Sequence, residues 1–497
     1  MSPLNQHDHY QRLIQLSKRL PPLSQLITPS RTEKYHIKGP HLSFSYAHCQ
    51  VTDPILTHLQ GLCHDQHISE KLAALLNNEP VNKSENRAVT HLQSRQAHST
   101  SLDAQQRRRL QRYYDQQQQT PPEHIVHIGT GGSHLGPQLL YDALKVWSTC
   151  QGLPYIPVTF ISNIDMDYIH SQLQEIPLNK TLFIVQSKSG STQEVTLILN
   201  ALRQYANNHD ISPAQFKSQC LAVTCQNSPL DNARLFQEIF YMSPEIGGRY
   251  SVTSAIGAST LSLAFSPDVF ERVLKGARDM DQHAQSHKLL HNMSLLAASI
   301  QIWERCILAY NSQAILPYSS SLSRLPHFIQ QLECESNGKQ CDLNFEALPY
   351  PSAPVIIGDT GTNFQHSFGQ MLHQGSDITP ATFIAFTKTC QNDDPDMQRA
   401  LIENLSAQSY ALAMGQESSN LNTHFHGNRP SRILTATQLS PESLGALISF
   451  FENQVMFEGF LLNINSFDQE GVQLGKTLAQ NIEEIPHLTH FVNHLIK

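Results

Sequence analysis

The sequence contains no hydrophobic run that could cross a membrane. No stretch approaches the roughly 18 consecutive apolar residues that a transmembrane helix needs. The N-terminal MSPLNQHDHYQRLIQ also lacks the apolar segment of a secretory signal peptide. We therefore expect a cytoplasmic protein with no part embedded in a membrane.

Paired cysteines are absent as well. None of the nine cysteines belongs to a CxxC motif, and the closest neighbours are Cys220 with Cys225 and Cys334 with Cys341. These spacings fit neither a zinc ribbon nor a small disulfide framework. We therefore expect reduced thiols and no metal site built from cysteine.

Charged residues are scarce. They make up 15% of the 497 residues, against about 25% in an average protein, and the formal net charge is −8. The basic triplet Arg107–Arg109 stands alone in a polar stretch, so nucleic acid is not expected as a partner. Isolated basic groups on an acidic protein still suit an anionic small molecule, because their field dominates at short range.

Apolar patterning predicts an α/β protein with mostly parallel sheets. Residues 1–93 show helical periodicity and look like an appendage, whereas strands alternate with helices from Glu123 onward. We expect a smaller α/β domain over residues 94–265 and a larger one over residues 266–497, with a long helix from Leu289 to Tyr310. The expected strands lie at 124–129, 157–162, 181–186, 221–225, 313–319, 354–358 and 381–386.

The loops that follow such strands are where ligands bind in open parallel sheets. The loop GTGGSHLGP begins at Gly129, but His134 replaces the glycine that a dinucleotide fingerprint requires, and no GK[ST] of a P-loop is present. The loop SKSGST, Ser187–Thr192, feeds a helix through an expected capping pair of Ser191 with Glu194. Its hydroxyls at a helix N-terminus suit a phosphate monoester, although a plain capping loop remains open.

A second candidate site lies in QLECESNGK, Gln331–Lys339. Leu325, Phe328, Ile329 and Leu332 form one stripe of a helix that Gly338 should end. Gln331 and Glu335 then lie one turn apart on the flank of this stripe and could line a cleft. A solvated glutamate at a helix end is the alternative.

Three further segments each have an ordinary explanation when taken alone. Arg249 in GGRYS could hold an oxyanion, and His366 in GTNFQHSFGQ could exchange a proton near neutral pH. Gln469 and Lys476 in DQEGVQLGK are seven residues apart and share a helix face. A surface arginine, a structural histidine and an exposed lysine are the competing interpretations.

Together and in this order, these segments resemble the glucose-6-phosphate isomerase (phosphoglucose isomerase) family. The resemblance runs from NKSENRAVTH at Asn82 to about residue 480, and QxxxESNGK with GGRYSxxSAIG is its most specific part. It implies two unequal sugar-isomerase-type (SIS) domains with three α/β/α layers, beside a helical N-terminal segment. It also implies a homodimer without metal or cofactor that interconverts glucose 6-phosphate and fructose 6-phosphate in glycolysis and gluconeogenesis.

The resemblance also implies a role for each matching residue. Glu335 would transfer a proton through a cis-enediol, and Arg249 would stabilise its negative charge. His366, supplied by the neighbouring subunit, would open the sugar ring with Lys476. Substrate binding would fall to Gly132, Ser133, Ser187, Lys188, Ser189, Thr192, Gln331 and Gln469.

Some positions depart from the family pattern, and two other functions stay open. Gly190, Ser191, Thr130, Phe364 and Glu470 replace residues that are usual in the family, and Phe364 lies beside His366 in the sequence. A sugar-phosphate sensor without catalysis is one alternative. An isomerase that also accepts mannose 6-phosphate is the other.

Overall fold

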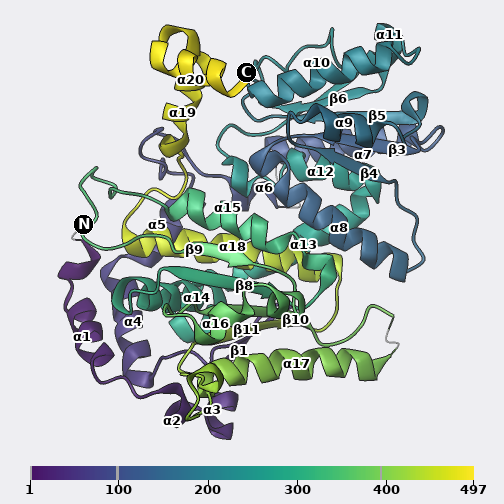
Figure 1. Cartoon of the computed structure of the whole chain (residues 1–497). Helices are drawn as coiled ribbons and strands as arrows, with labels where there is room; N and C mark the ends of the chain where they lie inside the picture. Colours follow the sequence, from purple (N-terminus) through teal and green to yellow (C-terminus); the bar gives the residue numbers. More distant parts are fainter. Residues whose placement is uncertain (1–2, 97–99, 392–393, 497) are drawn as a thin grey trace.

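Two β-sheets, each covered by helices on both faces, form the framework of the molecule (Figure 1). A computed structural model describes residues 3–96, 100–391 and 394–496. None of the helices in these three ranges combines the length and the apolar character that crossing a bilayer requires.

The first sheet has five parallel strands in the order β4-β3-β5-β6-β7. One face packs against α7, α8 and α12, and the other against α9, α10 and α11, which gives three layers. The strands are β3 His124–Ile128, β4 Val158–Ile161, β5 Thr181–Gln186, β6 Cys220–Thr224 and β7 Glu238–Tyr241; the helices are α7 Leu102–Gln117, α8 Leu135–Cys150, α9 Met166–Leu173, α10 Gln193–Asn207, α11 Pro213–Ser218 and α12 Ala255–Ala264. The first four strands were predicted, whereas the edge strand β7 was not.

The second sheet has six strands in the order β1-β2-β11-β10-β8-β9. Its strands are β1 His36–Lys38, β2 Ser43–Ser45, β8 Ser312–Pro317, β9 Val355–Gly358, β10 Ala381–Phe386 and β11 Ser431–Ala436. The last four are parallel, and the hairpin β1-β2 joins β11 in antiparallel fashion. The N-terminal segment therefore supplies two short strands besides its helices, which include α1 Asp8–Ser17, α4 Asp53–Asp65 and α5 Ile68–Leu76.

One helix lies at the centre of the packing around this sheet. Helix α18, Pro441–Leu462, is buried along almost its whole length and contacts α13 Pro267–His283, α14 Met293–Ile302 and α15 Leu325–Asn337. A helix that is buried on all sides is stable only when other elements cover it. The opposite face of the sheet packs against α16 Gly369–Gln374 and α17 Pro395–Met414.

The prediction of a single long helix from Leu289 to Tyr310 is wrong. The chain instead forms a short 3₁₀ turn, Leu289–His291, then α14, then a π-helical turn, Trp303–Ile307. Asn292 separates the first two, because its side-chain oxygen accepts a hydrogen bond from the Leu295 N–H at 3.0 Å and so caps α14. The expected domain division at residues 93 and 265 stays a prediction.

Candidate active site

A cavity of about 680 Å³ brings together the candidate residues from the two sheets. It lies beyond the carboxyl ends of β3 and β5, where open parallel sheets bind ligands. Every candidate residue except His366 lines it, namely Gly132, Ser133, Ser187, Lys188, Ser189, Thr192, Arg249, Gln331, Glu335, Gln469 and Lys476. Segments that are far apart in the sequence thus form one site.

The loop from Ser187 to Thr192 is held in shape by its own hydroxyls. Ser187 Oγ lies 2.8 Å from Thr192 Oγ1 and accepts a hydrogen bond from the Gly190 N–H at 3.1 Å. Gly190 has a φ of +66°, and a Cβ there would come within 2.5 Å of Ser228 Oγ. The replacement of a bulkier residue by Gly190 therefore suits both the backbone conformation and the space.

The prediction that Ser191 and Glu194 form a capping pair is wrong. Helix α10 begins at Gln193 with Thr192 as its N-cap, and no side chain caps it. The physical reason is that the Thr192 hydroxyl is turned toward Ser187. The first N–H groups of α10 therefore remain available to an anion at the positive end of the helix dipole.

The glycine-rich loop after β3 packs directly on the segment that contains Arg249. A Cβ on Gly132 would lie 2.0 Å from the Gly248 carbonyl oxygen, so only glycine permits this approach. The Ser133 carbonyl accepts a hydrogen bond from His127 Nε2 at 2.7 Å. Burial lowers the pKa of His127 to about 3, which keeps this supporting histidine neutral.

Glu335 lies near the end of α15, as the apolar stripe predicts. The helix ends at Asn337, and Gly338 follows it. Gln331 Nε2 donates to Glu335 Oε2 at 2.9 Å from one turn back. Arg249 Nη1 lies 3.6 Å from Glu335 Oε1. The carboxylate is therefore held between an amide and a cation while its side chain stays 23% exposed toward the cavity.

Arg249 is fixed by a ring of oxygen acceptors. Its Nε donates to Ser336 Oγ at 2.6 Å, and its Nη1 donates to Gln469 Oε1 at 3.2 Å. Its Nη2 donates to the carbonyls of Ser466 at 2.5 Å and Asp468 at 3.0 Å. A buried guanidinium with all its nitrogens paired is a preorganised positive charge rather than a mobile surface group.

His366 lies apart from these residues. It ends a short 3₁₀ helix, Asn363–His366, where its side chain is exposed and outside the cavity. Phe364, the departure from the family pattern beside it, is fully buried and packs against Tyr318 and Phe383. Lys476, in contrast, reaches the cavity from the exposed helix α19, Gln473–Gln480.

Sequence reasoning missed several residues around the cavity. Asn82, Glu85 and Arg87 line it, and a second cavity of about 450 Å³, which Glu335 also lines, is lined by Lys339 and Asp468, among others. The available signal was the run NKSENR at Asn82, in which amide and charged side chains stand between apolar segments. Spacing within that run gives no indication of a shared site.

Burial also lowers the pKa of two lysines at the site. It lowers the pKa of Lys188, although the nearby Cys225 and Glu85 raise it. It lowers the pKa of Lys339 likewise, against the opposing effect of Asp468. Within the described ranges, no cluster of three or more His, Cys, Asp or Glu side chains could hold a metal ion.

Comparisons with known proteins identify the family. The family model described as phosphoglucose isomerase matches residues 45–495. A glucose-6-phosphate isomerase of Treponema denticola is 40% identical over 476 residues, which cover 91% of this chain and 89% of that protein. One of Chlamydia pneumoniae is 38% identical over 480 residues, covering 93% and 90% of the two chains.

Solved structures point to the same family. The crystal structure of a glucose-6-phosphate isomerase from Chlamydia trachomatis has a TM-score of 0.93 to this fold, at 35% identity and with 99% of each chain covered. A hypothetical protein from Thermus thermophilus shares the fold with a TM-score of 0.69 at 22% identity, over 86% of this chain and 95% of its own. The α/β fold class expected from the sequence is confirmed, and the chain belongs to the phosphoglucose isomerase family.

Proposed function

We propose that this protein catalyses the reversible isomerisation of glucose 6-phosphate and fructose 6-phosphate, a step of glycolysis and gluconeogenesis. The observation that carries the proposal is the Glu335 carboxylate, which faces the cavity beside the paired cation Arg249. Aldose-ketose isomerisation needs one base that moves a proton between neighbouring carbons, and one fixed charge that stabilises the oxyanion formed meanwhile. The similar proteins are named glucose-6-phosphate isomerases, after the same reaction.

The loop Ser187–Thr192 binds the phosphate in this proposal. The hydroxyls of Ser187, Ser189 and Thr192 and the uncapped N-terminus of α10 provide donors at one end of the cavity. Lys188 adds a half-buried positive charge. Since this loop and Glu335 line the same cavity, a phosphate bound at the loop would let the sugar carbons extend toward the carboxylate.

The reaction begins when the sugar ring opens. His366, contributed by a partner subunit, and Lys476 exchange protons with the ring oxygen and the first hydroxyl in this step. Glu335 then removes the proton from the second carbon, and the electron pair forms a cis-enediolate whose oxygen charge Arg249 stabilises. A proton moves from the second oxygen to the first, and the same carboxylate, now protonated, returns its proton to the first carbon, which gives the ketose with its carbonyl group at the second carbon.

The remaining cavity residues orient the open-chain sugar. Gln331 and Gln469 provide amide groups, and each already bonds to a member of the Glu335–Arg249 pair. Gly132 and Ser133 provide the contact with the sugar from the opposite loop. Neither the proton transfer nor the charge stabilisation requires a cofactor in this mechanism.

A homodimer is part of the proposal, because His366 is exposed and lies outside the cavity of its own chain. Helices α19 and α20, Pro486–Ile496, contain no buried residue, and Leu474, Phe491 and Leu495 are more than half exposed. Apolar surface of this kind is normally covered by another protein surface. We also place the enzyme in the cytoplasm, since a charged sugar phosphate does not cross a bilayer unaided.

The test is conversion of fructose 6-phosphate to glucose 6-phosphate, coupled to a glucose-6-phosphate dehydrogenase, with and without a chelator. Turnover that is insensitive to the chelator supports the proposal. Absence of turnover contradicts it, and stabilisation by the substrate without turnover would indicate a sensor instead. The same assay with mannose 6-phosphate decides whether the enzyme has the broader specificity.

A further inference from the structure

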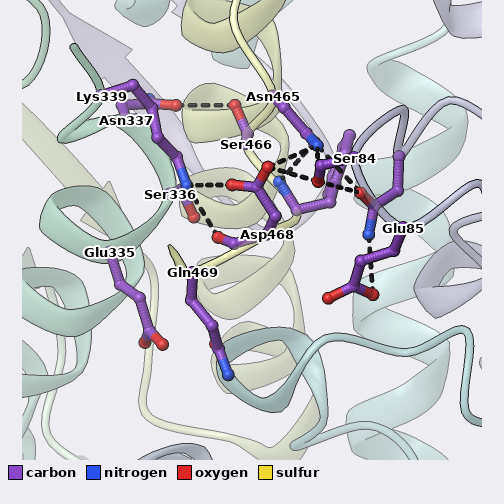
Figure 2. Close-up of polar contacts among 12 residues, drawn as sticks. Ser84, Glu85, Glu335, Ser336, Asn337, Lys339, Asn465, Ser466, Asp468 and Gln469 are labelled. Carbon is purple, nitrogen blue, oxygen red and sulfur yellow. Dashed lines mark hydrogen bonds and ion pairs between the residues drawn. The ribbon is translucent and has the colours of Figure 1, made fainter. Parts of the chain in front are cut away.

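Asp468 lies at the centre of a hydrogen-bond network next to the Glu335–Arg249 pair (Figure 2). Its Oδ2 accepts hydrogen bonds from Ser84 Oγ at 2.6 Å and Asn465 Nδ2 at 2.8 Å. Its Oδ1 accepts one from Lys339 Nζ at 2.5 Å. Because Asp468 is only 9% exposed, this carboxylate is a buried part of the site rather than a surface charge.

The backbone carbonyl of the same residue holds two cations. It accepts a hydrogen bond from Lys339 Nζ at 2.7 Å and another from Arg249 Nη2 at 3.0 Å. The next residue along the chain, Gln469, bonds to Arg249 Nη1. Asp468 therefore connects the segment Ser466–Gln469 to both positive groups that lie near Glu335.

The ammonium of Lys339 would form an ion pair with Glu335 if Asp468 did not bind it. It follows Glu335 by four residues, across the end of α15, and Glu335 is among the charges that act on its pKa. Its ammonium is turned to Asp468, and in Figure 2 the Glu335 side chain lies apart from the dashed contacts around Asp468. An ammonium this poorly solvated needs a carboxylate partner, since its side chain is only 15% exposed.

Other charged groups also face this region. Arg249 is the nearest to Glu335, at 3.6 Å. The main cavity adds Arg87, Lys188, Lys476 and the acids Glu85, Glu194 and Glu245, and the second cavity adds Lys83, Asp342 and Glu470. Among these, Lys339 and Arg249 are the two that share Asp468 as an acceptor.

We propose that Asp468 is a positioning residue for the isomerisation: its carboxylate keeps the Lys339 ammonium away from Glu335, while its carbonyl holds Arg249 beside Glu335. The inference rests on the proposed function. Without the carboxylate, the ammonium turns to Glu335, the other carboxylate whose charge acts on it. Glu335 is then stabilised as a carboxylate and becomes a weaker base.

The test compares wild type, Asp468→Asn, Lys339→Met and the double variant in the fructose 6-phosphate assay between pH 5 and 9. Asparagine keeps the carbonyl and nearly the same shape but removes the charge. We expect Asp468→Asn to lower kcat about tenfold with little change in KM. The acidic limb of the plot of kcat against pH should shift to lower pH by about one unit. The double variant should return that limb to the wild-type position and recover part of kcat, because the competing ammonium is gone.

A matched control is Asp279→Asn, which removes a carboxylate that binds Lys275 at 2.9 Å and His41 at 2.8 Å on the solvent-facing side of helix α13. It should leave the profile unchanged. Thermal unfolding checks that every variant is folded at the assay temperature. If Asp468→Asn has the wild-type profile, or if the double variant keeps the shifted limb, the inference is wrong; an inactive wild type would instead contradict the proposed function.

Discussion

The 3.6 Å between Arg249 Nη1 and Glu335 Oε1 is too long for a hydrogen bond but short enough for a strong charge interaction. Every nitrogen of Arg249 is meanwhile bonded to an oxygen of Ser336, Ser466, Asp468 or Gln469. The arginine can therefore stabilise negative charge in the cavity without locking the lone pairs of the base. This relationship is the physical core of the proposed mechanism.

The first prediction concerns Arg249→Lys. Lysine keeps the charge but cannot reproduce the fork of donors, so the charge moves and buried acceptors lose partners. We expect kcat to fall about 100-fold or more, in line with the loss of one oxyanion-stabilising group. Unfolding in urea should show a loss of about 1–3 kcal/mol in stability from the unpaired oxygens. Wild-type kcat in this variant would assign the stabilising role elsewhere.

The second prediction concerns Gly190→Ala in the phosphate loop. A Cβ at a φ of +66° and 2.5 Å from Ser228 Oγ forces the loop to move, so we expect KM to rise about tenfold or more. The matched control is Gly152→Ala, where φ is +64° but no atom lies within 4 Å of the added carbon. This control carries the same backbone strain and should keep the wild-type KM. Equal KM values in the two variants would show that the loop does not bind the phosphate.

The third prediction concerns stability and pH. Burial, together with the neighbouring carboxyl group, raises the pKa of Glu333 well above its usual value, and burial raises that of Glu458 to about 7. Since these groups hold protons more tightly in the folded state, stability falls as pH rises from about 4.5 through 7, by roughly 1.4 kcal/mol for each unit of pKa shift.

Urea unfolding at pH 5 and pH 8 checks this. Glu458→Gln, which stays neutral in the same volume, should lose less stability between the two pH values than wild type does. The two carboxyl groups lie behind the face of α15 that carries Glu335, and Asn337 Nδ2 is 3.4 Å from oxygens of both. An equal loss in the variant would mean that the pair does not titrate in this range.

The fourth prediction concerns His366 and the subunit interface. Mixing the inactive variants His366→Ala and Glu335→Gln under conditions that exchange subunits should restore about a quarter of the wild-type activity. A mixed dimer then has one complete site, composed of Glu335 from one chain and His366 from the other, and half of the dimers are mixed. Formation of mixed dimers without activity would place His366 in the site of its own chain, or outside the mechanism.

Sequence patterns predicted the parts of the fold that depend on local periodicity. The strand Thr181–Gln186 and the end of α15 before Gly338 are confirmed at the residue level, because a buried apolar run and a helix stop are both local signals. The strands β1, β2, β7 and β11 were missed. The first three have only three or four residues each, and β11, like β2, is fixed by a partner distant in the sequence.

The site residues likewise fall into those whose proximity follows from sequence spacing and those that only the fold brings together. Glu335 and Gln331 are one helical turn apart, so their proximity follows from spacing. The approach of Arg249, Asp468 and Gln469 to Glu335 depends on how α15 packs against two loops, for which no sequence period exists. Lys339 shows the consequence: it lies within a recognised motif, but its partner Asp468 is identified only by the fold.

The most direct test of the central claim is the release of deuterium from the second carbon of labelled glucose 6-phosphate by Glu335→Gln. Glutamine keeps the size of the side chain and an oxygen that can accept the hydrogen bond from Gln331, so the variant should fold as wild type does. We predict that both deuterium release and isomerisation fall by at least about 100-fold. A folded variant that releases deuterium at the wild-type rate would contradict the assignment of Glu335 as the base.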